Sequence, residues 1–291
     1  MRVARRPDEL ECRPRAVALG TFDGVHAGHQ RVLRAAVDAG PPPTVVTFTP
    51  HPRSALGNRV ELLTTLERRL ELIAAAGIAE TLLLEFTLDL ARMGASDFAA
   101  RFLRTIGAEV IVAGPDFRFG RARGGDLALL QQLGFETRPV PLVEGVSSTL
   151  IRSLLNAGEI ERAAPLLGRP AEVDGTVVTG DARGGRLGFP TANVRVEPDL
   201  VVPANGIYAG AAAGHRAAIS IGVNPHYGGV ERRVEAFLLD FSGDLYGERL
   251  VIELWRRLRD ERAFASEAEL VAQIAHDAAA ARLAQPPTVS A

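Results

Sequence analysis

Residues 18–33 read ALGTFDGVHAGHQRVL, and this stretch indicates the class of fold. The apolar run that leads to Gly20 has the composition of a strand, whereas apolar residues recur at helical spacing after His29. A glycine-containing turn separates the two patterns and carries His26 three residues before His29. The sequence therefore predicts a strand-to-helix junction, with both histidines where the helix begins.

A helix start of this kind favours the binding of anions. Backbone N–H groups without intrahelical partners point outward there, and the helix dipole adds partial positive charge. Because glycine lacks a Cβ, we expect a triphosphate to approach the backbone at Gly24 and Gly28. As donors, His26 and His29 would stabilise the charge that develops on an α-phosphoryl group and on a leaving pyrophosphate.

Two other interpretations of the histidine pair stay open. The two side chains could share a metal ion, although Cys12 and the scattered acids supply no recognisable third and fourth ligands. Two solvated histidines in a loop would be the default for a single histidine. The order of strand, glycines, histidines and helix favours phosphate chemistry over both alternatives.

The composition limits the classes of protein to consider. A chain of 291 residues with 47% hydrophobic and 23% charged residues is long enough for two domains, each with its own core. It has no run of eighteen apolar residues and no signal-peptide pattern, so we expect no membrane partner and a cytoplasmic location. The single cysteine excludes an internal disulfide and fits a reducing compartment.

All 33 basic residues are arginine, because the chain contains no lysine. This excludes a Walker A lysine and a Schiff-base lysine, and with them P-loop phosphoryl transfer and pyridoxal phosphate chemistry. Arginine side chains, backbone N–H groups or a metal ion must hold any phosphate. Arginine and acidic residues nearly balance in both halves of the chain, so we expect no nucleic-acid partner.

The two halves of the chain have different patterns. Residues 16–167 alternate short apolar runs with helical stretches, which predicts a parallel α/β sheet with ligands at the carboxyl ends of its strands. No GxGxxG follows a strand, which argues against a nicotinamide dinucleotide enzyme. From residue 171 onward, short glycine-rich alternating strands predict a small antiparallel barrel, and residues 266–284 predict a closing amphipathic helix. We therefore predict domains over 1–168 and 169–291.

Several motifs together resemble the bifunctional prokaryotic FAD synthetases, which join an FMN adenylyltransferase domain to a riboflavin kinase domain. The resemblance covers roughly residues 16–282. In the first half the motifs are GTFDGVHAGH at 20–29, VTFTPHP at 46–52, AGPDFRFGRARGGD at 113–126 and SSTLIR at 147–152. In the second half they are LGRP at 167–170, GDARGGRLGFPTANV at 180–194, PANGIYAG at 203–210, SIGVNP at 220–225 and VEAFLLDFSGDLYG at 234–247.

The resemblance implies an α/β protein in which a Rossmann-like nucleotidyltransferase domain precedes a β-barrel kinase domain with a C-terminal helix. It implies that ATP phosphorylates riboflavin to FMN, and that a second ATP converts FMN to FAD with release of pyrophosphate. Mg²⁺ accompanies ATP in this family, and the partners are riboflavin, FMN and ATP. For the oligomeric state we expect a monomer or a weak homo-oligomer.

The resemblance also implies site residues for adenylylation. His26 and His29 would bind ATP phosphates, and Ser148 and Arg152 would grip phosphates from the opposite side. The remaining members of this predicted site are Gly20, Phe22, Asp23, Gly24, Gly28, His51, Asp116 and Phe117. In a lysine-free cleft, a planar guanidinium such as that of Arg152 is a strong phosphate ligand. Alternatively, the serines cap a helix and Arg152 is merely solvated; capping and phosphate binding are compatible.

In the kinase half, Thr191 and Asn193 offer neutral oxygens to Mg²⁺, which needs few protein ligands when ATP supplies the others. An ordinary turn at the start of a strand is the alternative. The other predicted ATP or flavin ligands are Gly180, Arg183, Gly188 and Pro190. Glu235 is the predicted general base for the riboflavin 5′-hydroxyl, because strand alternation places its carboxylate among apolar side chains. The alternative is a cross-strand ion pair with Arg232 or Arg183.

Four positions depart from the family pattern: Ala113, Thr179, Arg186 and the pair His226-Tyr227. None of them removes a predicted catalytic group, but they affect the expected substrate tolerance. Two alternatives to a bifunctional enzyme therefore remain. One is a paralogue with one active half or an altered flavin or nucleotide substrate. The other is a non-catalytic flavin-binding protein.

Overall fold

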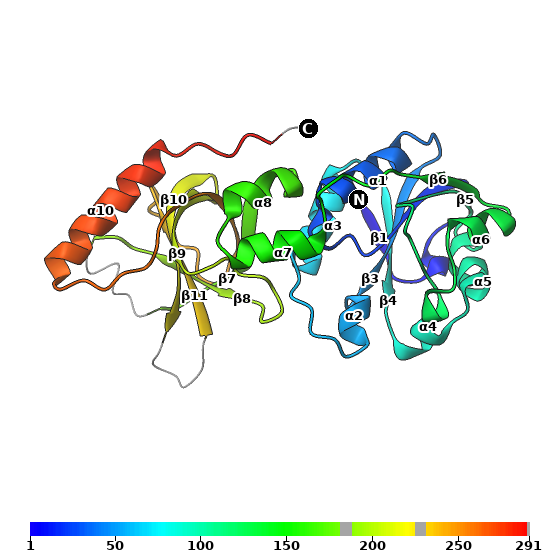
Figure 1. Cartoon of the computed structure of the whole chain (residues 1–291), viewed down its shortest axis with the longest axis horizontal. Coiled ribbons are helices and arrows are strands. Elements are labelled where there is room, and N and C mark those ends of the chain that lie inside the picture. Colours follow the sequence, from blue (N-terminus) through cyan, green and yellow to red (C-terminus); the bar gives the residue numbers. More distant parts are fainter. Residues whose placement is uncertain (181–187, 225–230, 290–291) are drawn as a thin grey trace. The chain divides into compact units, whose positions relative to one another are not determined.

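The structure is a computed structural model that describes residues 1–180, 188–224 and 231–289. The chain forms two compact units (Figure 1). Unit 1 comprises Met1–Glu61 and Leu66–Val146, and unit 2 comprises Leu62–Thr65 and Ser147–Ala291. The sequence pattern predicts a division after residue 168, whereas residues 147–168 group with unit 2. Which division separates independently folding parts stays a prediction.

A parallel sheet forms the centre of unit 1, with strand order β1-β4-β3-β2-β5-β6. Every neighbouring pair in this sheet is parallel. The strands are β1 (Arg2–Ala4), β2 (Arg15–Leu19), β3 (Pro43–Thr49), β4 (Glu80–Glu85), β5 (Ala108–Ala113) and β6 (Glu136–Pro139). The four central strands confirm the predicted α/β pattern, while β1 and β6 at the edges were not predicted.

Helices cover both faces of this sheet (Figure 1). They are α1 (Ala27–Val37), α2 (Pro52–Ala55), α3 (Leu66–Ala75), α4 (Leu88–Arg92), α5 (Ala95–Phe98) and α6 (Leu127–Gln132). Three short 3-10 helices are η1 (Pro7–Glu9), η2 (Asp23–Val25) and η4 (Arg121–Arg123), and η3 (Ala99–Arg104) is a π-helix that follows α5. Alternation along β2 separates two cores: Val17 packs with residues of η3 and α6, and Ala18 packs with residues of α1 and α3. Unit 1 is therefore a three-layer α/β structure.

Unit 2 contains a closed antiparallel barrel with strand order β10-β11-β8-β7-β12-β9. Its strands are β7 (Ala171–Val178), β8 (Ala192–Val196), β9 (Gly206–Ala212), β10 (His215–Asn224), β11 (Glu231–Leu238) and β12 (Arg249–Arg259). The predicted barrel is confirmed. Along the strands, residues of a buried inner face alternate with residues of a more exposed outer face. On β11, for example, Val234 and Ala236 are fully buried, whereas Glu235 between them is partly exposed.

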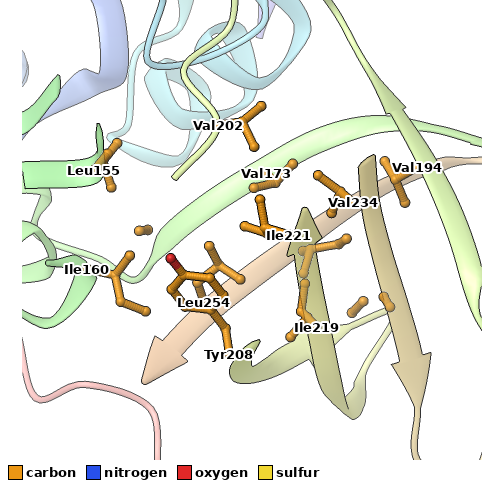
Figure 2. Packing of buried hydrophobic residues seen from close by; sticks show 14 of the residues in the cluster. Leu155, Ile160, Val173, Val194, Val202, Tyr208, Ile219, Ile221, Val234 and Leu254 are labelled. Atoms are coloured by element: carbon orange, nitrogen blue, oxygen red, sulfur yellow. The ribbon is translucent and has the colours of Figure 1, made fainter. Parts of the chain in front are cut away.

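Two helices, α7 (Ser148–Asn156) and α8 (Ile160–Leu167), contribute to the core of the barrel. Figure 2 shows Leu155 and Ile160 from these helices with barrel residues such as Tyr208, which is fully buried. The helical residues in this core are Ile151, Leu154, Leu155, Ile160, Ala163 and Leu167. The barrel therefore extends its core into a part of the chain that the sequence pattern assigned to the first domain.

The C-terminal helix α10 (Glu267–Leu283) packs on the outside of β9 and β10 (Figure 1). Its contact face includes Ala281 and the buried carboxylate of Asp277, which lies 2.6 Å from a guanidinium nitrogen of Arg259 on β12. The predicted C-terminal helix is confirmed, but its apolar residues are not gathered on one face as an amphipathic pattern requires. An ion pair as well as apolar contacts fixes it to the barrel. Within the described ranges, no helix is both long and apolar enough to cross a membrane.

Candidate active sites

A cleft of about 890 Å³ opens in unit 1 where β2, β3 and β5 end. Eight of the predicted site residues line it: Gly20, Phe22, His26, Gly28, His29, His51, Asp116 and Phe117. Parallel strands bring their carboxyl ends to one edge of a sheet, and the loops that follow them supply these side chains. Asp23 and Gly24 are buried in the same turn but are not among the lining residues.

The turn between β2 and α1 has an unusual backbone. Phe22 and Val25 have φ angles of 53° and 39°, and Gly24 has a φ of 77°. Side chains with a Cβ avoid this left-handed region, so both non-glycine residues carry backbone strain. The turn directs the Phe22 ring against the edge of His29, with ring centroids 5.4 Å apart.

The two histidines stack on one another at the start of α1. Their ring centroids lie 3.6 Å apart at an interplanar angle of 15°. His26 is the N-cap residue, and its Nδ1 accepts a hydrogen bond from the His29 backbone N–H at 3.3 Å. This confirms the predicted place of both histidines at a strand-to-helix junction.

Burial, the neighbouring His26 and the Arg69 guanidinium together hold the pKa of His29 well below its usual value of 6.5. His29 is therefore uncharged at neutral pH. Its Nδ1 atom is shielded from solvent and has no hydrogen-bond partner in the described part of the chain.

Gly28 leaves space for a neighbouring side chain. A Cβ at this position would lie 3.3 Å from two atoms of the His26 ring. The glycine thus makes room for the His26 imidazole, and the expected approach of a phosphate at Gly28 stays a prediction. His51 caps the short helix α2 by accepting from the Arg53 backbone N–H at 3.2 Å.

Aromatic side chains form an apolar wall of the cleft. Phe117 and Phe119 stack with centroids 5.6 Å apart at 14°, and Phe119 also meets Phe98 edge-on. Phe48 continues this wall towards the end of β3. The exposed carboxylate of Asp116 precedes Phe117 in the same loop. The cleft therefore combines an apolar surface suited to a planar ring with polar groups at the helix start.

Ser148 and Arg152 lie on α7, which belongs to unit 2. The N-cap of this helix is Ser147, whose side chain accepts from the Leu150 N–H at 3.2 Å. The capping role considered for the serines therefore falls to Ser147, and Ser148 is the first residue of the helix. The assignment of Ser148 and Arg152 to the adenylylation site stays a proposal.

The predicted kinase residues meet on the outer face of the barrel. Glu235 on β11 is the register partner of Asn193 on β8 and of Ser220 on β10. Register partners in antiparallel strands present their side chains on the same face. Thr191 lies two residues before Asn193, immediately before β8 begins.

Gly180 leaves space for the Asn193 side chain. A Cβ at position 180 would lie 2.3 Å from Nδ2 and 2.6 Å from Oδ1 of Asn193. Gly188 and Pro190 are exposed in the segment that leads to Thr191. Phe189, between them, meets Phe237 edge-on at 5.3 Å. These contacts connect the segment before β8 to β11, the strand that carries Glu235.

The carboxylate of Glu235 has a different ionic partner from the two considered. Oε1 of Glu235 lies 3.2 Å from Nη1 of Arg233 on the same strand. Arg232 instead donates to the backbone carbonyls of Val202 and Pro203.

Arg183 lies outside the described residues, as do Arg186 and the pair His226-Tyr227. Of the other departures from the family pattern, Ala113 is buried in β5 and Thr179 is exposed.

Two family models match the chain. A riboflavin kinase model matches residues 167–284, and an FAD synthetase model matches residues 9–153. The bifunctional riboflavin kinase/FMN adenylyltransferase of Listeria monocytogenes is 35% identical over 282 residues, covering 90% of each chain. The chain belongs to this bifunctional family. It phosphorylates riboflavin to FMN and adenylylates FMN to FAD.

Other relatives agree with this membership. The bifunctional riboflavin kinase/FMN adenylyltransferase of Escherichia coli is 35% identical over 286 residues and covers 91% of each chain. A crystal structure described as a macrolide-efflux protein from Streptococcus pneumoniae has a TM-score of 0.86 at 32% identity, covering 97% of this chain and 98% of that one. That description applies to the Streptococcus protein alone. The flavin-enzyme assignment rests on both family models and on the sequence relatives.

Sequence reasoning missed four arginines of the FMN adenylyltransferase part. Arg53, Arg118 and Arg123 line the cleft and would supply positive charge to phosphates. The run FRFGRARGG was an available signal for two of them. The fourth, Arg69, is buried on α3 and affects His29. Its signal was an arginine in the apolar stripe of a predicted helix.

In the described part of the chain, no three His, Cys, Asp or Glu side chains are grouped to hold a metal ion.

Proposed function

We propose that adenylylation takes place in the unit 1 cleft, with His26 and His29 binding the phosphates of ATP. The observation that carries this proposal is the imidazole stack at the start of α1, where backbone N–H groups and the helix dipole favour an anion. Because Nδ1 of His26 accepts a hydrogen bond, its ring proton lies on Nε2, which can donate to a phosphate oxygen.

The charge state of the pair suits a developing negative charge. His29 is neutral in the free protein, and a nearby polyphosphate favours the protonated form. Proton uptake would then stabilise the leaving pyrophosphate. Arg53, Arg118 and Arg123 add permanent positive charge around the same cleft. The stacked Phe117 and Phe119 rings support binding of a planar ring of the substrate, with Asp116 beside them.

Ser148 and Arg152 are proposed to hold phosphates in the same reaction, with Arg152 as a guanidinium fork. Arg152→Met should raise KM for ATP in FAD formation from supplied FMN, with FMN formation from riboflavin unchanged. Arg162→Met is the matched control, because Arg162 is an exposed arginine on α8 that pairs with Glu159. Equal effects of the two substitutions would remove Arg152 from the proposed site.

For the kinase reaction we propose Glu235 as the general base that accepts the proton of the riboflavin 5′-hydroxyl. The supporting observation is the register that places Glu235 beside Asn193 and Ser220 on the outer face of the barrel. A carboxylate next to the substrate hydroxyl would orient it and remove its proton as the phosphoryl group transfers.

Thr191 and Asn193 fit Mg²⁺ as ligands. Both supply the neutral oxygens that a hard cation accepts, and the missing Cβ at Gly180 leaves the Asn193 amide room to turn towards a ligand. When bound, Mg²⁺ would offset the charge of the ATP phosphates. Gly188 and Pro190 would set the course of the chain into Thr191, and Arg183 is proposed as a further ATP ligand.

A titration of Mg²⁺ tests the proposed kinase ligands. In Asn193→Ala, FMN formation should require a higher Mg²⁺ concentration for half-maximal rate, while FAD formation from supplied FMN keeps its wild-type Mg²⁺ dependence. Chromatography of the flavin products measures both reactions in the same chain. Asn205→Ala is a control, because Asn205 contacts Arg232 and Arg257 and is not among the proposed ligands. An unchanged Mg²⁺ dependence in Asn193→Ala would remove Asn193 from the metal site.

We propose a monomer or weak homo-oligomer in a reducing, cytoplasmic compartment. The single cysteine, Cys12, is exposed and free, which suits a reducing environment. Size-exclusion chromatography with light scattering at several concentrations tests the oligomeric state.

A further inference from the structure

A buried arginine lies behind the adenylylation cleft without lining it. Arg69 is on α3, where it takes a place in the apolar stripe that also contains the fully buried Ile73. Only 5% of Arg69 is exposed. A buried guanidinium needs hydrogen-bond acceptors, so its partners show what it does.

The Arg69 guanidinium connects the ends of two neighbouring strands. Its Nη1 donates to the Thr21 carbonyl at 3.0 Å, and its Nη2 donates to the Phe48 carbonyl at 2.9 Å. The backbone ladder between β2 and β3 ends at the bond from the Gly20 N–H to the Val46 carbonyl. Arg69 therefore links the two chain segments just after the last backbone hydrogen bond between β2 and β3, at the edge of the sheet where the cleft opens.

The segment that Arg69 holds is the strained turn. Thr21 is followed by Phe22 and Val25, whose φ angles of 53° and 39° lie in the left-handed region. Such a residue persists only where its surroundings fix it. Thr47 adds a second bond to the same carbonyl, from its Oγ1 at 3.1 Å.

Arg69 also contributes positive charge behind the histidine pair. The charged or titratable groups that act on His29 or on Arg69 include Asp23 in η2, His26 at the start of α1 and Arg69 itself on α3. His26 and Arg69 both disfavour a proton on His29, after burial itself. Asp23 favours the charged form of Arg69, whose pKa is lowered by burial.

We propose that Arg69 is a positioning residue for FMN adenylylation: by bridging the Thr21 and Phe48 carbonyls, it fixes the turn that carries Phe22, His26 and His29. The inference rests on the proposed role of the two histidines. It assigns to Arg69 no contact with substrate.

The test uses the intact chain and two substitutions of Arg69. Arg69→Met removes both the bridge and the charge, and it should lower kcat for FAD formation from FMN roughly tenfold to a hundredfold, as misplaced catalytic groups do. Arg69→Lys keeps the positive charge but replaces the planar guanidinium that reaches both carbonyls. It should therefore lower kcat less than Arg69→Met does, and the variant should remain folded. FMN formation from riboflavin in the same molecules should stay at the wild-type rate. Arg34→Met, an exposed arginine on α1, is the matched control and should change neither reaction.

Histidine NMR gives a readout that a merely structural role would not change. With ¹⁵N-labelled histidine, the ring signal of His29 is assigned by comparison with His29→Gln. Loss of the Arg69 charge should raise the pH at which His29 titrates in Arg69→Met, and Arg69→Lys and Arg34→Met should leave it near the wild-type position. The exposed His276 serves as an internal reference.

Two results would overturn the inference. One is a wild-type kcat for FAD formation in Arg69→Met together with an unchanged His29 titration. The other is an Arg69→Met chain that fails to fold while Arg69→Lys forms FAD at the wild-type rate. His29→Ala separates this inference from the proposed function. If His29→Ala strongly lowers FAD formation and Arg69→Met does not affect it, only the inference about Arg69 fails. If His29→Ala has no effect, the assignment of the histidines fails, and the inference fails with it.

Discussion

The two candidate active sites of this chain are built in different ways. In unit 1, the catalytic candidates His26 and His29 are three residues apart, and the single turn that follows β2 positions both of them. In unit 2, Asn193, Ser220 and Glu235 come from three strands, and only the register of the barrel brings them together. The first site is therefore local in sequence, whereas the second depends on long-range pairing.

The two candidate sites also differ in the groups they would use to hold ATP in a chain without lysine. Unit 1 offers a helix start, a stacked imidazole pair and arginines around a cleft. Unit 2 offers a carboxylate with neutral oxygens nearby, which suits a base and a magnesium ligand set. Substitutions should therefore separate the two reactions cleanly, and the following tests challenge that separation.

The largest expected effect comes from cutting the chain at the two candidate boundaries. A fragment of residues 169–291 lacks six apolar side chains that α7 and α8 add to the barrel core. At about 1.5–3 kcal/mol for each large side chain, their loss approaches the whole stability of a typical domain. We expect this fragment to fail to fold, and a fragment of residues 147–291 to fold and phosphorylate riboflavin.

Both fragments lack Leu62–Thr65, which groups with unit 2. The absence of this segment therefore affects both fragments equally and does not contribute to the difference in their stability. Urea unfolding followed by circular dichroism measures the difference. Equal stability of the two fragments would restore the boundary at residue 168 that the sequence pattern indicates.

His29→Ala should lower FAD formation from supplied FMN roughly a hundredfold to a thousandfold, as expected when a donor to developing charge is removed. FMN formation from riboflavin should be unchanged, because the kinase has its own phosphate site. Chromatography of the two products in separate assays measures both rates. An equal loss of both activities in a folded variant would contradict two independent sites.

Glu235→Gln should slow riboflavin phosphorylation by at least roughly a hundredfold, because glutamine keeps the shape and one oxygen but cannot accept the proton. FAD formation from supplied FMN should be nearly unchanged. Single-turnover phosphorylation and a thermal melt separate catalysis from stability, since the partly exposed pair with Arg233 contributes little to folding. A near-normal rate with a lowered melting temperature would make Glu235 structural.

Asp277→Asn should destabilise unit 2 by about 2 kcal/mol, because it removes one partner of a largely buried ion pair that anchors α10 to β12. Asp240→Asn is the matched control: its pair with Arg282 is exposed at both ends, so little change is expected. Urea unfolding measures both variants. The rate of FAD formation from FMN should not respond to either substitution, and a response would show that the two sites are not separate.

The smallest effect concerns pH. The unfolded chain takes up a proton on His29 near pH 6.5, whereas the folded protein resists protonation there because the pKa of His29 is lowered. This residue's contribution to stability is therefore complete above pH 6.5 and lost as the pH falls below it. Thermal melts at pH 7.5 and pH 5.5 should show a greater loss for the wild type than for His29→Gln. Equal losses would mean that His29 is freely protonated in the folded state.

Much of the unit 1 site could be predicted because its signals are local. The strand, the glycines, the histidines and the helix follow one another within sixteen residues, and the order itself indicates a phosphate site. Gly28 shows the limit of such reasoning, because its missing Cβ accommodates the His26 ring, a contact that depends on the exact course of the turn. Arg69 lies forty residues further along the chain and meets the site only through tertiary packing.

The barrel was predictable as a class of fold, but not in its extent. Alternation identifies which face of a strand is buried, yet it carries no information on which other segment covers that face. The contribution of α7 and α8 to the core was therefore invisible in a pattern that marked them as the end of an α/β domain. The partner of Glu235 was missed for a related reason, since two arginines were candidates and a third, Arg233, forms the pair.

By itself, the sequence determined the two-part architecture, the absence of lysine chemistry and the helix start that presents two histidines, because periodicity, composition and turn residues act over short stretches of chain. Only the tertiary structure decided the stacking of the histidine rings, the bridge from Arg69 and the meeting of Glu235 with Asn193. The bridge and the meeting of Glu235 with Asn193 depend on contacts between segments far apart in sequence, which the packing of the whole unit selects. The stacking of the rings depends on the exact course of one turn, which composition and periodicity do not specify.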